Sequence, residues 1–344
     1  MAPGVATLVR RAWAGETPGA RLLRAGLVPP ALAYGAIVAV RNRLYDAGWL
    51  AAARVPARVV SVGNLTVGGT GKTPAVLWAA TGLAARGRRV AIVARGYGKR
   101  RRGVVVVGAA GRALVAPEEG GDEAVMLAGR FAGPVVTAER RADAARLACE
   151  RFGADTIVLD DGFQHRALFR DVDLVLLADE PSDRLLPAGP AREPAASLAR
   201  AAAVLCMGER GAPPGVPAFR GRLRPAALVG PDGGVRGPAA ALAGADVTVV
   251  AGVARPERVA ATVVALGARV RGVLAFADHH AYAPADVPAL AAAAARTRLV
   301  TTEKDLVKLA RLAGVPPLVA LRVDLEVDGG ERLLALLAGG FAQG

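Results

Sequence analysis

Residues 61–74 read Ser61-Val62-Gly63-Asn64-Leu65-Thr66-Val67-Gly68-Gly69-Thr70-Gly71-Lys72-Thr73-Pro74. The apolar run Val59–Val62 at the start of this stretch predicts a strand, and the residues Thr73–Ala85 after it predict a helix. Glycines between a strand and a helix let backbone N–H groups turn inward around phosphate oxygens, and the helix N-terminus adds partial positive charge. We therefore predict a phosphate-binding loop here, with a glycine-rich turn that binds no ligand as the alternative.

The predicted loop also carries side chains suited to a nucleoside triphosphate. We expect Lys72 to contact the β- and γ-phosphates and the Thr73 hydroxyl to ligate Mg²⁺. The loop departs from the pattern G-x-x-x-x-G-K-[ST], because Thr66 occupies the first glycine position. Its core resembles the loop of membrane-surface switch ATPases, although Val67 stands where those proteins carry a signature lysine. The predicted ATP-binding residues are Thr66, Val67, Gly68, Gly69, Thr70, Gly71, Lys72 and Thr73.

Two adjacent carboxylates follow a second apolar run. Thr156–Leu159 predicts a strand, and Asp160 and Asp161 come directly after it. Adjacent carboxylates repel each other unless a cation lies nearby, and beside a phosphate-binding loop that cation is expected to be Mg²⁺. Asp160, Asp161 and Thr73 are therefore the predicted metal ligands, and a capped turn after a core strand is the alternative.

Short Val/Ile/Leu runs alternate with Ala-rich stretches from Arg58 onward, which is typical of a parallel sheet covered by helices. The other strands expected before residue 208 are Val90–Val93, Val104–Val107, Val135–Thr137, Leu174–Leu177 and Val204–Met207, and the other helices are Asp122–Arg130, Arg140–Phe152 and Pro194–Ala202. Residues 208–236 are rich in Gly, Pro and Arg and predict a hinge or a domain boundary. After it we expect strands at Val247–Ala251, Val273–Phe276, Leu299–Thr301 and Leu318–Val323, and helices at Pro256–Leu266, Ala285–Arg296 and Glu303–Ala310.

These patterns predict an α/β protein with four parts. They are an N-terminal segment at residues 1–50, a P-loop α/β/α core domain at 51–215, a hinge at 216–236 and a smaller α/β domain at 237–344. A hydrophobic fraction of 53% in 344 residues suffices for two packed cores and excludes a disordered chain. Cys149 and Cys206 are too few for a disulfide scaffold or a zinc cluster, so we expect a reducing compartment.

The net charge of +14 is concentrated at the N-terminal side. Residues 1–102 contain 17 of the 44 basic residues but only Glu16 and Asp46 as acids, and 40 of the 44 are arginine. A high pI is typical of nucleic-acid-binding proteins, but these interleave basic residues with aromatics, which are only 4% here. The basic excess instead accompanies an apolar segment, so we expect no nucleic-acid partner.

That apolar segment, Ala25–Val40, has 16 uncharged residues and contains Pro29-Pro30. A spanning helix needs about 20 residues, so a polytopic membrane protein is excluded. The layout resembles a secretory signal peptide, which we reject because a loop for cytosolic ATP follows. Arginines on both sides, among them Arg10 and Arg11, favour a helix lying in an anionic membrane surface. A buried N-terminal helix of the soluble core is the alternative.

All three histidines lie just after predicted strands, where open α/β sheets bind ligands. His165 ends the run that begins at Asp160, and His279 and His280 follow Asp278. A neutral imidazole oriented by Asp278 is suited to general-base or substrate-polarising work, and a solvated loop without a role is the alternative.

Three further features are weaker by themselves. Asp122 opens a predicted helix, as an N-cap or as a functional carboxylate. Arg95 and Tyr97 lie in a basic, glycine-containing loop that suits an anionic substrate. Arg192 and Glu193 follow a Gly/Pro-rich turn.

Taken in order, seven motifs resemble those of the tetraacyldisaccharide 4′-kinase (lipid A 4′-kinase) family of Gram-negative bacteria. They are Val62–Pro74, Arg95–Gly98, Gly121–Glu123, Asp160–His165, Leu186–Pro190, Phe276–His280 and Thr301–Asp305, and the resemblance covers about Leu22 to Val323. It implies transfer of the ATP γ-phosphate, with Mg²⁺, to the 4′-hydroxyl of a tetraacylated glucosamine disaccharide 1-phosphate. It also implies a P-loop core domain, a smaller α/β domain on a two-stranded hinge and an N-terminal membrane-associating helix.

The resemblance further implies roles for individual residues. Asp122 is implied as the general base, assisted by His279; Asp278 and Lys72 complete the expected catalytic set. Further active-site residues are Gln164, His165, Arg192 and Glu193, with Arg95 and Tyr97 as substrate candidates. The implied partners are the anionic glycolipid and the cytoplasmic face of the bacterial inner membrane, with no obligate protein partner.

A membrane-surface switch ATPase or a GTPase is the main rival interpretation. Val67 in place of the signature lysine argues against the ATPase. The guanine-reading pattern [NT]-K-x-D is missing, because Thr302-Glu303-Lys304-Asp305 has the wrong spacing.

Overall fold

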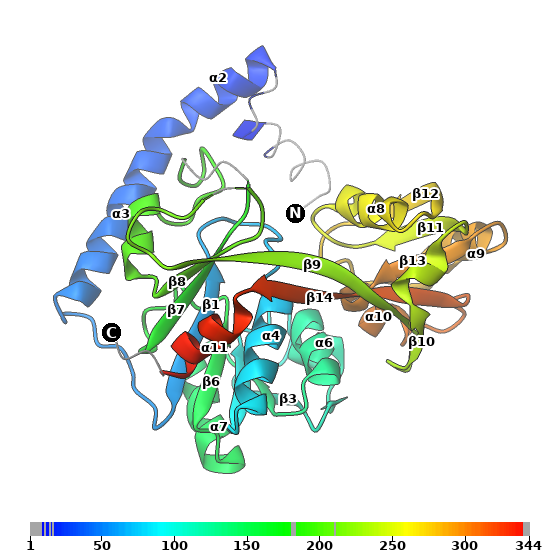
Figure 1. Cartoon of the computed structure of the whole chain (residues 1–344). Helices are drawn as coiled ribbons and strands as arrows, with labels where there is room; N and C mark the ends of the chain where they lie inside the picture. Colours follow the sequence, from blue (N-terminus) through cyan, green and yellow to red (C-terminus); the bar gives the residue numbers. More distant parts are fainter. Residues whose placement is uncertain are drawn as a thin grey trace. The chain divides into compact units, whose positions relative to one another are not determined.

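The computed structural model describes residues 17–179, 184–209 and 211–339, together with residues 9, 12, 13 and 15. Arg10 and Arg11 of the predicted basic N-terminus lie outside the described residues. The chain has the mixed α/β architecture expected from its sequence (Figure 1). It divides into two compact units. Unit 1 comprises residues 1–95, 140–222 and 326–344, and unit 2 comprises residues 96–139 and 223–325.

Unit 1 is built on a parallel sheet in the order β8-β7-β1-β6-β2. Its strands are β1 (Arg58–Asn64), β2 (Val90–Ala94), β6 (Thr156–Asp160), β7 (Val172–Leu177) and β8 (Ala203–Cys206). Val60, Ile92 and Ile157 are fully buried, as are most of their neighbours, because both faces of the sheet are covered. The continuous apolar runs in the sequence therefore form strands that are buried on both faces.

Unit 1 contains five α-helices and one 3₁₀ helix in its described part. They are α2 (Pro18–Gly26), α3 (Val28–Asp46), α4 (Lys72–Ala85), α7 (Arg141–Phe152), α11 (Gly330–Ala338) and the 3₁₀ helix Ala195–Arg200. Helix α4 packs on β1, β2 and β6, and α11 packs on α4, where Leu334 lies against Gly82. The predicted helix Pro194–Ala202 is realised as the shorter 3₁₀ helix, and α11 was not predicted.

Unit 2 contains a second parallel sheet, in the order β12-β11-β13-β14, and a small antiparallel group β5-β3-β4. The strands of the parallel sheet are β11 (Asp246–Ala251), β12 (Arg269–Ala275), β13 (Arg298–Thr302) and β14 (Leu318–Asp328). The small group consists of β3 (Val105–Ala109), β4 (Arg112–Ala113) and β5 (Val135–Thr137), and β9 (Ala218–Val229) pairs with β10 (Val235–Pro238). The helices are α5 (Pro117–Gly120), α6 (Asp122–Arg130), α8 (Pro256–Ala265), α9 (Val287–Ala294) and α10 (Glu303–Leu309), with 3₁₀ turns at Ala239–Leu242 and Pro284–Asp286.

The two units differ from the domains expected from sequence. Residues 96–139, expected in the core domain, belong to unit 2 because α6 packs on α10, where Arg130 forms an ion pair with Glu303. Residues 326–344, expected in the smaller domain, belong to unit 1 because α11 covers α4. The unit boundaries fall inside β9 and β14, so regular strand occupies part of the predicted hinge at 216–236.

Helix α3 of the N-terminal segment is attached to unit 1 through one side. Ala31, Val38 and Asn42 are buried, whereas Leu32 and Ile37 are about two-thirds exposed, at 69% and 67%. In the described part of the chain no single helix has the length and apolar composition to cross a membrane; α2 and α3 meet that criterion only as a pair bent by 43°.

The packing of α11 can be tested by truncating a buried leucine. Leu337 is fully buried, so Leu337→Ala is expected to lower the free energy of unfolding by about 2–5 kcal/mol. Leu336→Ala changes a partly exposed neighbour on the same helix and should cost clearly less. Denaturant unfolding followed by the fluorescence of Trp78, which lies beside α11, measures both in a background without the other two tryptophans. Equal, small losses would contradict this packing.

Candidate active site

The phosphate-binding loop predicted from sequence connects β1 to α4. Strand β1 ends at Asn64, and α4 begins at Lys72 after Gly71 as its N-cap residue. Gly71 has φ = 85°, in the left-handed region that favours glycine, so the chain can turn sharply into the helix. The free backbone N–H groups of the first turn of α4 therefore lie at the end of the loop.

A second segment of unit 1 pairs with the loop and positions Arg192. The backbone N–H of Val67 donates to the carbonyl of Pro190 over 2.8 Å, and that of Arg192 donates to the carbonyl of Leu65 over 2.7 Å. The Gly/Pro-rich turn seen in the sequence thus lies against the loop, and Arg192 enters the site beside it.

Two positively charged side chains, those of Lys72 and Arg192, lie next to Asp161 at the end of β6. Strands β1 and β6 are neighbours in parallel register, which brings Asp160, the last residue of β6, and Asp161 after it to the end of β1 where the loop begins. Lys72 Nζ lies 3.6 Å from Asp161 Oδ1 and 3.1 Å from Asn64 Oδ1, and Arg192 Nη1 lies 2.8 Å from Asp161 Oδ2. Burial raises the pKa of Asp161, but the charges of Lys72 and Arg192 outweigh it and hold the pKa below its usual value.

The oxygen atoms at this edge fit Mg²⁺. Within the described residues Asp161 Oδ1 is buried and accepts no hydrogen bond, and its backbone has φ = 50°, which non-glycine residues seldom adopt. The described part of the chain has no cluster of three or more His, Cys, Asp or Glu residues that would enclose a metal. The predicted ligands Asp160, Asp161 and Thr73 would give Mg²⁺ an incomplete set of oxygens, which suits an ion that also binds phosphates and water.

His165 and Gln164 lie next to this edge. Arg141 is a hydrogen-bond donor only, so the 3.3 Å contact between its Nη1 and His165 Nδ1 makes that ring nitrogen an acceptor and leaves the proton on Nε2. Burial, and the positive charges of four arginines, lower the pKa of His165 to about 4. His165 is therefore neutral at physiological pH. Gln164 donates to the carbonyl of Asn64, and Arg192 Nη1 lies 3.4 Å from its side-chain oxygen.

Glu193, also predicted as an active-site residue, connects the site to α3. Its side chain is only 1% exposed and accepts hydrogen bonds of 2.8 Å from both Asn42 and Arg200. Tyr34 of α3 donates to the carbonyl of Arg192 over 2.9 Å. Glu193 thus anchors the N-terminal helix beside the residues that surround Asp161.

The second set of predicted catalytic residues comes together in unit 2. Asp122 opens α6, and His279 follows β12 with φ = 60°. His279 Nδ1 lies 3.1 Å from Asp122 Oδ1 and 3.0 Å from Oδ2, and the Tyr97 ring centroid is 4.9 Å from that of the imidazole. Gly121 has φ = 92° and packs against the backbone of Gly96. Both this backbone conformation and this close approach favour glycine over any residue with a side chain.

Electrostatics keep the Asp122 carboxylate ionised although its side chain is only 8% exposed. Burial alone would raise the pKa of Asp122, but the hydrogen bond and charge of His279 and the charges of Lys304 and Lys308 lower it to about 2. In return, the hydrogen bond to Asp122 raises the pKa of His279 above its ordinary value, more than burial lowers it. Nδ1–H of the imidazole donates to Asp122, so the neutral ring has its lone pair on Nε2.

The three residues of the Asp-His-His motif, Asp278, His279 and His280, have different partners. Asp278 was expected to orient the imidazole, but it pairs with Lys304 at 2.8 Å and stays 3.9 Å from His279 Nε2. His280 turns away, with Nε2 3.0 Å from Asp286, and stacks on Phe276. The partner that orients His279 is Asp122, a contact between residues 157 positions apart that spacing cannot reveal.

Some contributors were missed or only partly anticipated. Asn64 and Arg141 contact predicted site residues in unit 1, and Lys308 contacts Asp122 in unit 2. The four-residue spacing between Lys304, in the motif Thr301–Asp305, and Lys308 was the available signal that both lysines share one face of a helix. Arg95 contributes to unit 1 through its charge near His165, whereas the predicted loop partner Tyr97 lies in unit 2.

Comparison with known proteins identifies the family. Residues 23–340 match the sequence model of the family described as tetraacyldisaccharide-1-P 4′-kinase. The chain belongs to this family. It is 45% identical to the tetraacyldisaccharide 4′-kinase of Anaeromyxobacter dehalogenans strain 2CP-C, over 95% of this chain and 93% of that protein. It is 40% identical to the one of Geobacter sulfurreducens, over 92% of this chain and 94% of that protein.

The fold of this 4′-kinase family member matches a solved structure. The "apo" form of LpxK from Aquifex aeolicus in complex with ATP superposes with a TM-score of 0.80 and 32% identity, and covers 93% of this chain and 99% of that one. The family resemblance, the P-loop kinase fold and the kinase class predicted from sequence are thereby confirmed.

The pairing of Asp122 and His279 predicts a specific titration. In ¹⁵N NMR of the three labelled histidines, Asp122→Asn should lower the pKa of His279, because it removes a hydrogen bond and a negative charge.

The same pair makes the stability of the fold depend on pH. The raised His279 pKa stabilises the fold at pH values below 6.5, and this stabilisation is lost as the pH rises through the pKa of His279 in the folded protein. The lowered Asp122 pKa stabilises the fold above pH 3.8, and that part is lost as the pH falls toward about 2.

A matched variant controls for indirect effects on this titration. Asp286→Asn removes the partner of His280 and should leave the titration of His279 unchanged. If His279 titrates identically in wild type and Asp122→Asn, the pairing does not exist in solution.

Proposed function

We propose that the chain transfers the γ-phosphoryl group of ATP to the 4′-hydroxyl of a tetraacyldisaccharide 1-phosphate. The observation that carries the proposal is the buried, ionised Asp122 paired with His279. A phosphate-binding loop alone is common to many nucleotide hydrolases. A positioned base, in contrast, suits transfer to an alcohol, because it can accept the hydroxyl proton. The names of the relatives and the ATP complex of the solved relative support the choice of both substrates.

Unit 1 is the proposed ATP-binding part. Residues 66–73 would surround the phosphates, with Lys72 moving from its contacts with Asn64 and Asp161 to the phosphate oxygens. Arg192 adds a second positive charge beside Asp161. Thr73, Asp160 and Asp161 would hold Mg²⁺, which supplies charge neutralisation on the β- and γ-phosphate oxygens.

Unit 2 is the proposed source of the base. The 4′-hydroxyl oxygen forms a bond to the γ-phosphorus, the bond from that phosphorus to the β–γ bridging oxygen breaks, and ADP leaves. The hydroxyl proton passes to Asp122, assisted by His279. A carboxylate with a pKa of about 2 is a weak base alone, but the hydrogen bond to an imidazole of raised pKa lets the proton belong to the pair. Tyr97, against His279, would contact the acceptor sugar.

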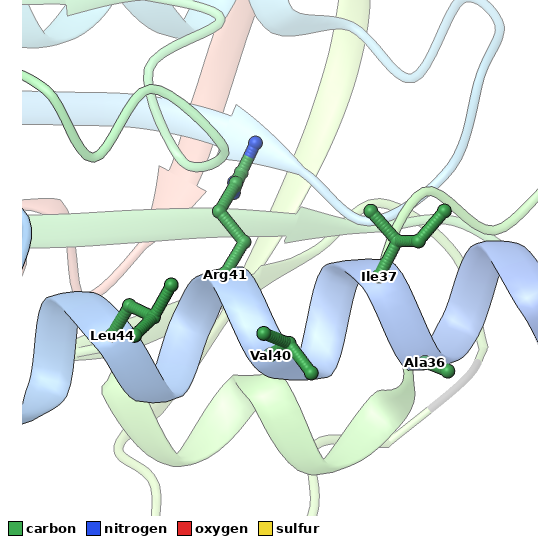
Figure 2. Close-up of a pocket in the computed structure, with 5 residues that line it drawn as sticks. All are labelled: Ala36, Ile37, Val40, Arg41 and Leu44. Atoms are coloured by element: carbon green, nitrogen blue, oxygen red, sulfur yellow. The ribbon is translucent and has the colours of Figure 1, made fainter.

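The exposed face of α2 and α3 supports a lipid substrate and peripheral attachment to the cytoplasmic face of the inner membrane. Figure 2 shows four apolar side chains and Arg41 lining a shallow pocket along α3; the residues are Ala36, Ile37, Val40, Arg41 and Leu44. Arg41 also donates to the carbonyl of Gln164 over 2.9 Å, so this apolar face continues to the predicted site residues of unit 1. Apolar side chains beside Arg21, Arg24 and Arg43 suit acyl chains and anionic head groups.

Removal of the proposed base should separate catalysis from ATP binding. Asp122→Ala is expected to lower kcat by about 10³-fold, because the hydroxyl proton loses its acceptor, while the Kd for ATP stays near that of the wild type. Phosphate transfer from labelled ATP to the disaccharide lipid and calorimetric ATP binding measure the two effects. Lys72→Met should weaken ATP binding as well. Wild-type turnover in Asp122→Ala would exclude this residue as the base.

Attachment to the membrane surface should depend on the apolar face of α3. Ile37→Glu places a charge on an exposed position and is expected to reduce co-sedimentation with phosphatidylglycerol-containing vesicles about tenfold. Val264→Glu, at a 54% exposed apolar position on α8, is the matched control and should keep wild-type sedimentation. Equal sedimentation of both variants would argue against α3 as the membrane-facing element.

A further inference from the structure

Helix α10 carries two lysines, Lys304 and Lys308, on the side that faces α6. Lys304 and Lys308 are four residues apart, so both project from the same side of the helix, and α10 packs on α6. Lys304 pairs with Asp278, as described above. Lys308 has a side chain only 9% exposed, and its Nζ lies 3.3 Å from Asp122 Oδ2 and 3.5 Å from Asp305 Oδ1. The same carboxylate oxygen of Asp122 therefore receives both Lys308 and His279.

The backbone around His279 also depends on α10. Asp305 is completely buried, and its Oδ2 accepts hydrogen bonds from the backbone N–H of Gly252, over 3.0 Å, and from the Thr302 hydroxyl, over 2.8 Å. The carbonyl of Gly252 in turn accepts the backbone N–H of His279 over 3.2 Å. One short helix thus contacts Asp122 directly and supports His279 through the end of β11.

We propose that Lys308 is a positioning residue for phosphoryl transfer, whose ammonium group fixes Asp122 against His279 while Asp305 anchors both Lys308 and the His279 loop. This inference rests on the proposed function, because it assigns Lys308 a role in the base pair used there. Lys308 acts through Asp122 and does not itself contact the reacting atoms.

An ammonium is needed here because the carboxylate is buried. Without Lys308, and with a neutral imidazole, Asp122 would be a buried charge with no positive partner in direct contact. Burial raises the pKa of such a carboxyl group and favours its protonated form. The Lys308 ammonium, 3.3 Å from Asp122 Oδ2, supplies that positive partner. The centroid of the Tyr282 ring lies 5.4 Å from Lys308 Nζ.

The composition of the chain points to the same conclusion. Forty of the 44 basic residues are arginine, so lysine is the exception. The side chains of the four lysines, Lys72, Lys99, Lys304 and Lys308, are only 16%, 3%, 13% and 9% exposed, and each is paired with a carboxylate. The lysines of this chain are thus buried partners of carboxylates, as Lys308 is of Asp122.

Other charged or titratable groups around the pair set the sign of the expected pH effect. They are Glu123 on α6, Lys304 and Asp305 on α10, Asp278 after β12, and the Tyr97 hydroxyl. Lys304 already balances Asp278, and Lys308 lies between Asp122 and Asp305. Loss of the Lys308 charge therefore leaves excess negative charge, which favours the protonated form of the pair and raises its pKa.

The test compares Lys308→Met, Lys308→Arg and Arg130→Met in the full-length protein. Lys308→Met keeps the aliphatic volume without the charge, and the acid limb of its kcat/KM profile should move up by about one pH unit. Its kcat should fall about 10²-fold, with the KM for ATP unchanged. Lys308→Arg should restore most of the limb position, because it restores the charge.

Arg130→Met is the matched structural control. Arg130 joins the same two helices through Glu303, but it does not touch Asp122 or His279. It should lower the Tm without moving the acid limb. A Lys308→Met enzyme that loses activity only in proportion to its folded fraction, with the limb in the wild-type position, would overturn the proposal.

A substrate-independent measurement separates this inference from the proposed function. In ¹⁵N NMR, Lys308→Met should raise the pKa of His279 and Arg130→Met should not. If the wild type phosphorylates no disaccharide lipid but this NMR shift is found, the proposed function fails while the role of Lys308 in positioning the pair stands. An unchanged His279 titration in Lys308→Met overturns the role of Lys308 even if the kinase activity is present.

Discussion

Parallel strand pairing is the constraint on which both candidate sites depend. In a parallel sheet all carboxyl ends meet at one edge, so side chains from distant parts of the chain converge there. In unit 1 this places the loop after β1 beside Asp161 after β6. In unit 2 it places Gly252 after β11 near His279 after β12, with α10 starting directly after β13. One rule of sheet geometry therefore assembles the candidate phosphate-binding site of unit 1 and positions His279 of the candidate base pair in unit 2.

Each edge buries carboxylates, and each compensates for them with cations from a second element. Asp161 is held between Lys72 of α4 and Arg192 of the neighbouring turn. Asp122 is held between His279 and Lys308. Both Asp161 and His279 have positive φ, which is energetically unfavourable for these residues and persists only where surrounding contacts fix the backbone. The strain and the charge compensation occur at the same places.

Local chemistry explains which features could be predicted from the sequence and which could not. The loop at residues 66–73, the strand ending at Asp160 and the helix starting at Asp122 follow from periodicity, glycine placement and capping, which act over a few residues. The assignment of residues 96–139 to unit 2 depends on the contact of α6 with α10, and the position of α11 depends on Leu334 and Gly82. These contacts join segments more than 150 residues apart, and a single sequence contains no signal for them.

The sequence by itself determined the fold class, the phosphate-binding loop and the residue types needed for phosphoryl transfer, because those depend on patterns between near neighbours. The tertiary structure decided which residues act together. In it, His279 pairs with Asp122 and not with Asp278, and His280 contacts Asp286. Glu193 anchors α3 through its hydrogen bond with Asn42. The tertiary structure also brought Lys308 to the buried carboxylate. Burial is the physical reason, because a charge removed from water must find its partner among the groups that the fold brings within a few ångströms, wherever they lie in the chain.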